Sequence, residues 1–237
     1  MPRDDEVIPP ATARALAAIR CGIEANDAAF DALFPPAMQS VSRRFWTPIA
    51  VALVAARMLV DRRSARVLDI GAGVGKLCLV GALSTGASFT GLERRPGLVD
   101  IARGVAGKLQ LSTASFVHGE LEAIDWGQYD SIYLFNPFEE NLFGPEEQLD
   151  QSVPLSDARF HRDVSLVEHG LKAAPVGMRL VTYHGFGGRV PPGYRLMEEF
   201  GPGVNRLCLW VKVSERTRLE SDEKHASTRV SADDGAP

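Results

Sequence analysis

The sequence has few cysteines, and their scarcity excludes several kinds of protein. Three cysteines occur among 237 residues, at positions 21, 78 and 208. They are odd in number, widely spaced and free of any C-x-x-C pair, which argues against a disulfide framework and against a zinc cluster. We therefore expect no metal site, and a reducing cytoplasmic location.

Long apolar runs and an excess of positive charge are also absent. The longest apolar run, residues 49–56, is far shorter than the roughly 20 residues that span a bilayer. The first residues show no basic segment followed by an apolar core, so we expect no signal peptide. A net charge of −4 gives no general attraction to nucleic acid or to an anionic membrane. We expect neither a membrane segment nor a strong nucleic-acid partner.

Three alternating glycines stand out in residues 67–76. A β-favouring run that includes Asp69 leads into Gly71, Gly73 and Gly75, and an apolar helical pattern follows from Lys76. This order predicts a strand, a turn and a helix. Glycines leave no side chain on the turn and permit positive φ, so a ligand can lie against the backbone near the N–H groups of the helix start.

The glycine spacing decides between ligands. A nicotinamide fingerprint requires G-x-G-x-x-G, and a P-loop requires G-x-x-x-x-G-K-[ST]. Neither fits. The D-x-G-x-G-x-G pattern of Asp69, Gly71, Gly73 and Gly75 resembles motif I of the class I S-adenosylmethionine-dependent methyltransferases. The resemblance implies S-adenosylmethionine as cofactor, with its methionine moiety at these residues; a close-packed turn without a ligand is the alternative.

The next predicted strand, residues 88–93, ends in a carboxylate. Glu93 follows Gly71 by 22 residues, about where the acid of a βαβ nucleoside-binding unit accepts hydrogen bonds from ribose hydroxyls. We predict this role for Glu93. The alternative is a solvated charge paired with Arg94 or Arg95.

A third strand over residues 115–118 leads into Glu120 and Leu121. In class I methyltransferases an acid and an apolar residue at this place contact the adenine amine and the ring face. The resemblance therefore implies that Glu120 and Leu121 bind the adenine.

The fourth strand, residues 130–135, ends in Asn136, Pro137 and Phe138. These residues resemble, in shortened form, the (Asp/Asn)-Pro-Pro-(Tyr/Phe) motif of amino methyltransferases, and the non-SET histone lysine methyltransferases have a similar turn. The resemblance implies that Asn136 and the following carbonyl accept hydrogen bonds from the target amine, while Phe138 stacks on the substrate. One proline is missing from the motif, so nitrogen is favoured without a named acceptor. An Asn-Pro turn can also simply end a strand.

Three further features surround the predicted site. Trp46 precedes a helix over residues 48–60 and either lines the pocket or anchors the N-terminal helices. Residues 139–155 contain five acids and no base, which indicates a lid, a recognition loop or a solvated loop. His184 ends a fifth strand and is a candidate general base or a hydrogen-bonded turn residue.

The element order predicts a doubly wound α/β fold. We expect a Rossmann-like, mostly parallel seven-stranded sheet with the order 3-2-1-4-5-7-6, closed by an antiparallel hairpin over residues 194–213, and an N-terminal helical extension. The predicted division is disordered residues 1–9, a helical cap at 10–62, the cofactor-binding methyltransferase domain at 63–213 and a disordered tail at 214–237.

The predicted function is methyl transfer from S-adenosylmethionine to a nitrogen of a small molecule or protein side chain. Amino methylation of nucleic acid is an alternative, and so is a non-catalytic protein that keeps the cofactor pocket. A nicotinamide dehydrogenase is opposed by the glycine spacing and the closing hairpin. The acceptor and the oligomeric state stay open at this stage.

Overall fold

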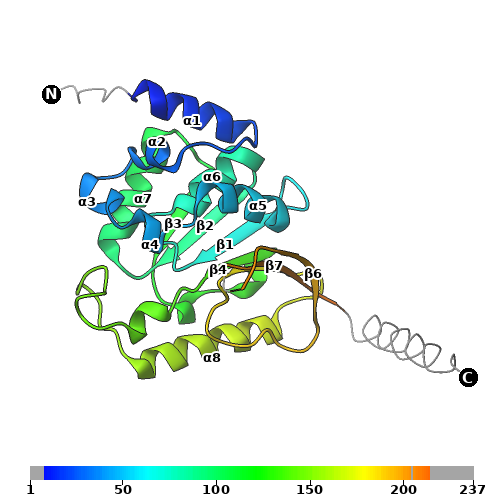
Figure 1. Cartoon of the computed structure of the whole chain (residues 1–237). Coiled ribbons are helices and arrows are strands. Elements are labelled where there is room, and N and C mark those ends of the chain that lie inside the picture. Colours follow the sequence, from blue (N-terminus) through cyan, green and yellow to red (C-terminus); the bar gives the residue numbers. More distant parts are fainter. Residues whose placement is uncertain (1–7, 204, 214–237) are drawn as a thin grey trace, which may run out of the picture.

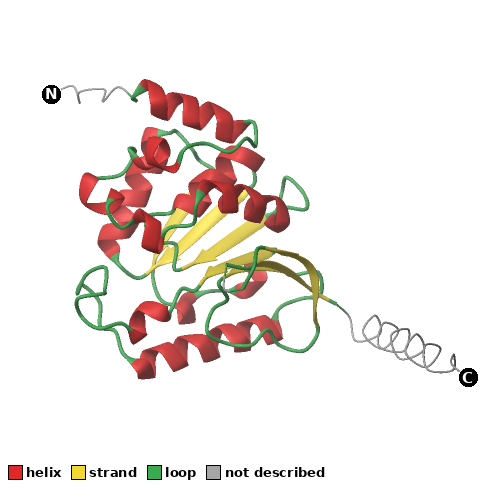
Figure 2. Cartoon of the chain, viewed as in Figure 1, coloured by secondary structure: helices red, strands yellow, loops and turns green. Residues whose placement is uncertain are grey.

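The computed structural model describes residues 8–203 and 205–213. Helices cover both faces of a central sheet, as Figures 1 and 2 show. The predicted disordered segments lie outside the described residues, apart from residues 8 and 9.

The sheet has seven strands in the order β3-β2-β1-β4-β5-β7-β6, which confirms the predicted topology. The strands are β1 Arg66–Ile70, β2 Ser88–Glu93, β3 Ala114–His118, β4 Ser131–Phe135, β5 Arg179–Tyr183, β6 Tyr194–Phe200 and β7 Leu207–Lys212. The first five run parallel, whereas β7 is antiparallel to both β5 and β6. The carboxyl ends of β1, β2 and β4 therefore meet at one edge, where an open α/β sheet binds its ligand.

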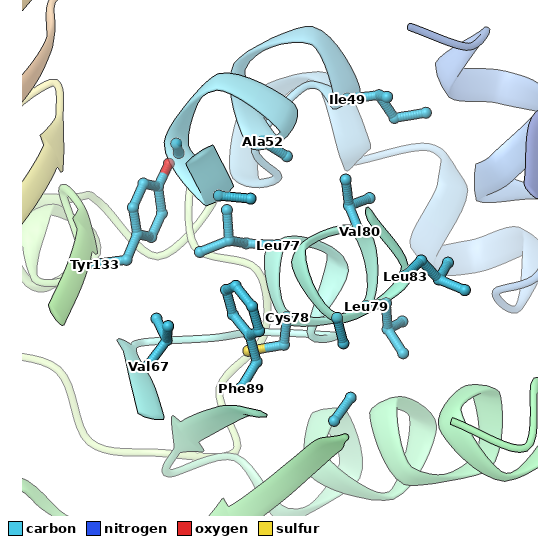
Figure 3. Packing of buried hydrophobic residues seen from close by; sticks show 14 of the residues in the cluster. Ile49, Ala52, Val67, Leu77, Cys78, Leu79, Val80, Leu83, Phe89 and Tyr133 are labelled. Carbon is cyan, nitrogen blue, oxygen red and sulfur yellow. The ribbon is translucent and has the colours of Figure 1, made fainter. Parts of the chain in front are cut away.

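Three helices pack on one face of the sheet: α5 Ile49–Leu59, α6 Lys76–Thr85 and α7 Pro96–Lys108. Figure 3 shows α6 at the centre of this layer, with Ala52 of α5 on one side and Val67 and Phe89 of the sheet on the other. Packing explains why residue 81 is a glycine, since a Cβ there would lie 2.4 Å from the Phe89 ring. The close approach of α6 to β2 depends on this missing side chain.

The helix α8, Asp157–Ala173, packs on the opposite face (Figure 1). Ser156 caps its N-terminus, because its side chain accepts a hydrogen bond from the Arg159 N–H at 3.2 Å. Val164, Val167 and Leu171 are buried on the helix face that packs toward the sheet.

Four short helices precede α5: α1 Pro10–Arg20, α2 Asp27–Asp31, α3 Pro36–Gln39 and α4 Ser42–Phe45. Ile19 and Phe30 are fully buried in the same core as α6, so these helices extend the layer on that face. The Thr47-Pro48 pair in the sequence predicts Thr47 as the N-cap of α5, and this prediction is wrong. The cap position is Pro48, and the Thr47 hydroxyl instead hydrogen bonds to that of Tyr133 on β4 at 3.0 Å.

The part of the chain that the structure describes contains three 3-10 helices: η1 Leu121–Ala123, η2 Trp126–Gln128 and η3 Glu139–Leu142. Residues 184–193 join β5 to β6, and these residues, all described, form no helix.

Candidate functional site

The turn after β1 carries its three glycines in left-handed backbone, with φ of 75° at Gly71, 55° at Gly73 and 78° at Gly75. Each glycine has a different surrounding. A Cβ at Gly71 would lie 2.8 Å from Pro137, and one at Gly75 would lie 2.2 Å from the Phe116 ring. A Cβ at Gly73 would meet no atom within 4 Å. Gly73 is therefore the point where the turn faces open space.

Glu93, at the end of β2, is fixed against this turn. Its Oε2 accepts a hydrogen bond from the Gly73 N–H at 3.0 Å, and its Oε1 accepts one from the Arg95 N–H at 2.9 Å. The side chain is buried but still reaches the cavity described below. The alternative, a solvated charge paired with Arg94 or Arg95, does not describe Glu93: the side chain is buried and its contact is to the backbone N–H of Arg95.

A cavity of about 230 Å³ lies at this edge of the sheet. It brings together nine residues that the sequence singled out: Trp46, Gly71, Gly73, Glu93, Glu120, Leu121, Asn136, Pro137 and Phe138. Its mouth and walls include five residues that the sequence did not single out as site residues: Arg44, Phe45, Phe135, Phe143 and Asp163. Arg44 and Phe45 precede α5, Phe135 ends β4, Phe143 follows β4 in the acidic loop, and Asp163 lies on α8.

The turn after β4 forms one wall. Asn136 has a φ of 40°, and its N–H donates to the Gly185 carbonyl at 3.0 Å, which holds the turn in an unusual conformation for a non-glycine residue. Pro137 lies against Gly71, and Phe138 is buried. Backbone strain of this kind tends to occur where a side chain must be aimed.

The adenine end predicted at Glu120 and Leu121 is joined to α8 by charged side chains. Glu120 forms an ion pair with Arg159, which also lies 3.3 Å from Asp163. Burial raises the pKa of Asp163, although Arg159 opposes the shift. Leu121 is buried and offers an apolar surface beside these charges.

Arg94 lies at the same end of the cavity. Burial, and then the neighbouring Arg159, lowers its pKa. Its Nη1 is enclosed and has no hydrogen-bond partner in the described part of the chain. This donor is the kind of group that a bound molecule can satisfy.

Arg95 connects the acidic loop to β2. Its guanidinium contacts Glu140 through Nη1 and Nη2 at 3.0 and 2.8 Å, and its Nε contacts Asp150 at 2.9 Å. Burial alone would lower the pKa of Arg95, but Glu140 and Asp150 raise it above the ordinary value. The loop is thus held across the mouth of the cavity by an ion pair in which both Arg95 and Glu140 are largely buried.

Trp46 lines the cavity and also anchors the N-terminal helices, so both sequence interpretations describe real contacts. Its ring centroid lies 4.8 Å from that of Phe34, and the Lys76 Nζ lies 5.7 Å from the Trp46 ring centroid. Lys76, the first residue of α6, is buried with its Nζ 2.5 Å from Asp27 and 2.7 Å from Asp31. Burial raises the pKa of Asp31, with Lys76 opposing the shift.

Asp69 lies beside the main cavity and lines a smaller one of about 30 Å³, which is near the size of one water molecule. Burial raises the pKa of Asp69 to about 7, while a hydrogen bond that Cys78 Sγ donates at 3.5 Å opposes the shift. Tyr133 and Lys76 share the wall of this smaller cavity. Gly71 lines both cavities and so joins them.

Three predicted site residues do not line the main cavity: Asp69, which lines the smaller one, Gly75 and His184. Gly75 packs against Phe116, and His184 lines a different cavity beyond Phe135. Within residues 8–203 and 205–213, no cluster of three or more His, Cys, Asp or Glu could hold a metal ion. In the same ranges, no helix is long and apolar enough to cross a membrane.

No protein-family model matches the chain, and no curated protein matches it. Solved structures do. An RNA methyltransferase from Salinibacter ruber, in complex with S-adenosyl-L-homocysteine, is similar with a TM-score of 0.50 and 18% identity, over 71% of this chain and 94% of that chain. The fold is that of class I methyltransferases.

Two other solved structures share this methyltransferase fold. TrmN from Thermus thermophilus has a TM-score of 0.50 and 20% identity, over 70% of this chain and 49% of that chain. A mutant of MtNAS has a TM-score of 0.50 and 16% identity, over 87% of this chain and 78% of that chain. At these identities the likeness concerns the arrangement of the chain and leaves ligand and reaction to the residues of the site.

Proposed function

We propose that this chain binds S-adenosylmethionine and transfers its methyl group to a nitrogen atom. One observation carries the proposal: the Glu93 carboxylate, held by the Gly73 N–H, lines the same cavity as the strained Asn136 turn. The proposed ribose-binding acid, Glu93, and the proposed acceptor-binding amide, Asn136, thus line the same cavity. The Salinibacter ruber protein of the same fold was crystallised with S-adenosyl-L-homocysteine, which supports the cofactor.

The residues present fit this cofactor. Each Glu93 oxygen has spare lone pairs for a ribose hydroxyl after accepting one backbone hydrogen bond. Gly73 leaves room for the ligand to lie against the turn, since no atom lies within 4 Å of where its Cβ would be. Leu121 gives an apolar contact for adenine, and Asp69 lies beside Gly71 where the resemblance puts the amino group.

The chemistry demands orientation more than proton transfer. The cofactor, when bound, supplies an electrophilic methyl group on a sulfonium. Asn136 would accept a hydrogen bond from the acceptor amine and so direct the lone pair of the amine nitrogen toward the methyl group. Phe138 and Trp46 would exclude water from the space around the amine. The acid-rich loop held by Arg95 would favour neutral or cationic acceptors over phosphorylated ones.

Methyl-tritiated S-adenosylmethionine tests the proposal. The purified chain would be incubated with a cell extract separated into small molecules, protein and nucleic acid. We expect label in the small-molecule or protein fraction, and its loss with Asn136→Ala. Label in nucleic acid would change the acceptor class. No label in any fraction from protein that binds the cofactor would replace the proposal with a non-catalytic binding protein.

A further inference from the structure

A second cavity, of about 890 Å³, lies beside β5, β6 and β7. It shares no lining residue with the main cavity. It lies beside the connection of residues 184–193, which joins β5 to β6 without a helix. His184, Phe186, Arg189, Tyr194 and Trp210 line it.

A wall of residues separates the two cavities. The Asn136 N–H donates to the Gly185 carbonyl at 3.0 Å, and the rings of Phe135 and His184 meet edge to face with centroids 5.2 Å apart. Phe135 and Asn136 line the main cavity, whereas His184 and Gly185 line the second. The second cavity is therefore a separate site that touches the main one through these contacts.

Two ring nitrogens at the second cavity lack partners. His184 Nε2 and Trp210 Nε1 are both enclosed, and neither has a hydrogen-bond partner among the described residues. An indole N–H can only donate, so its partner must be an acceptor atom. An enclosed donor without a partner is rare in native proteins, and an acceptor atom of a ligand would satisfy the Trp210 N–H.

The charges and the apolar surface narrow the ligand. Arg206 is paired with Glu199 at 3.3 Å, whereas the exposed Arg189 guanidinium forms no ion pair in the described part of the chain; the Glu168 carboxylate accepts a hydrogen bond from the Arg189 backbone N–H at 2.7 Å instead. Tyr194 donates its hydroxyl to the Leu171 carbonyl and presents its ring, beside Phe186. Aromatic surface, free N–H donors and one spare cation together fit an anion with a flat apolar body.

We infer that the second cavity binds a small aromatic carboxylate. Its ring lies against Tyr194 and Trp210, above the buried Phe186, and its carboxylate accepts from Trp210 Nε1 and pairs with Arg189. This site does not depend on the proposed methyl transfer, because none of its residues lines the main cavity.

Calorimetric titration with benzoate and indole-3-acetate tests the inference, with benzamide and indole-3-acetamide as neutral matched probes. We expect saturable binding of the acids, and about tenfold or more weaker binding of the amides. Arg189→Gln, at an exposed position, and Trp210→Phe should each weaken the acids by a similar factor. The matched controls Arg20→Gln, at another exposed position, and Trp126→Phe should not.

Three results would overturn the inference. The first is the absence of saturable binding to the wild-type chain, and the second is unchanged affinity in folded Arg189→Gln. The third is displacement of the acids by S-adenosyl-L-homocysteine, which would assign them to the main cavity. Unchanged S-adenosyl-L-homocysteine affinity in both variants is the expected sign of a separate site.

Discussion

The Glu93 carboxylate and the Gly73 N–H are joined by a hydrogen bond of 3.0 Å, so the end of β2 and the turn after β1 form one rigid unit. The second carboxylate oxygen accepts from the Arg95 N–H. Arg95 in turn holds Glu140 and Asp150 of the acidic loop. The proposed ribose acid is therefore connected through Arg95 to the acidic loop, which lines the cavity through Glu140.

The first prediction concerns Glu93. Glu93→Ala removes the proposed ribose acceptor, and we expect S-adenosyl-L-homocysteine binding to weaken by about 1.5–3 kcal/mol for each hydrogen bond lost. Calorimetry on folded protein measures this loss. Glu24→Ala, at an exposed position on the N-terminal side, is the matched control. Unchanged affinity in folded Glu93→Ala would remove Glu93 from the cofactor site.

The second prediction separates the side chain of Asn136 from its backbone. Asn136→Gly permits the φ of 40° and deletes only the amide, so we expect a normal fold, near-normal cofactor affinity and a large loss of turnover. Asn136→Ala should lose the same turnover and also some stability, because alanine disfavours positive φ. Methyl-transfer rates and cofactor titrations on both variants give the comparison. Equal losses of turnover and affinity in Asn136→Gly would make Asn136 a cofactor-binding residue.

The fold could be predicted because its signals are local. Alternating glycines after a buried strand, a carboxylate at the end of β2 and the closing hairpin each occupy a few consecutive residues, and together they fix the strand order. Thr47 shows where this fails. Its Thr-Pro sequence is typical of a helix start, yet the hydroxyl is taken by Tyr133, which lies 86 residues away in the sequence. Tertiary contacts of this kind leave no local pattern.

The missed parts of the site have the same cause. The local sequence offers Arg95 only Glu93 as a partner. Nothing near Arg95 in the sequence indicates its ion pairs with Glu140 and Asp150. Lys76 follows the glycine turn as an ordinary first helix residue, and its carboxylate partners come from α2, 45 to 49 residues earlier. A buried lysine with no acid in its own helix turn indicates a carboxylate partner elsewhere in the chain. The sequence does not show that Lys76 is buried, so this signal could not be used.

The third prediction contrasts two glycines of the turn. Gly75→Ala combines a φ of 78° with a Cβ 2.2 Å from the Phe116 ring, so we expect it to destabilise folding by about 2–4 kcal/mol. Gly73→Ala meets no atom, and should cost only about 1–2 kcal/mol of stability for its positive φ while weakening cofactor binding. Urea unfolding and cofactor titration measure both effects. Equal effects of the two substitutions on binding would contradict the different surroundings of these glycines.

The fourth prediction concerns Lys76. Lys76→Met leaves the buried Asp31 without its cation, and breaking a buried ion pair costs about 3–5 kcal/mol. We expect the lower end of that range, because the Asp27 partner is 45% exposed. The double variant Lys76→Met with Asp31→Asn should recover part of the loss, since no charge is then buried. Urea unfolding measures all three proteins, with the exposed Lys172→Met as control. A loss no larger than that of the control would show that the ion pair adds nothing to stability.

The fifth prediction follows from Asp69, whose pKa burial raises to about 7. An unfolded Asp titrates near pH 3.9. Between these values the folded state keeps a proton that the unfolded state has released, so the free energy of unfolding falls as pH rises, by up to about 1.4 kcal/mol per pH unit. This contribution is fully present below about pH 4 and is lost above about pH 7. Urea unfolding from pH 5 to 7 should show that slope in the wild type and a flatter one in Asp69→Asn. The exposed Asp100→Asn should keep the wild-type slope, and an unchanged slope in Asp69→Asn would show that Asp69 is ionised in the folded chain.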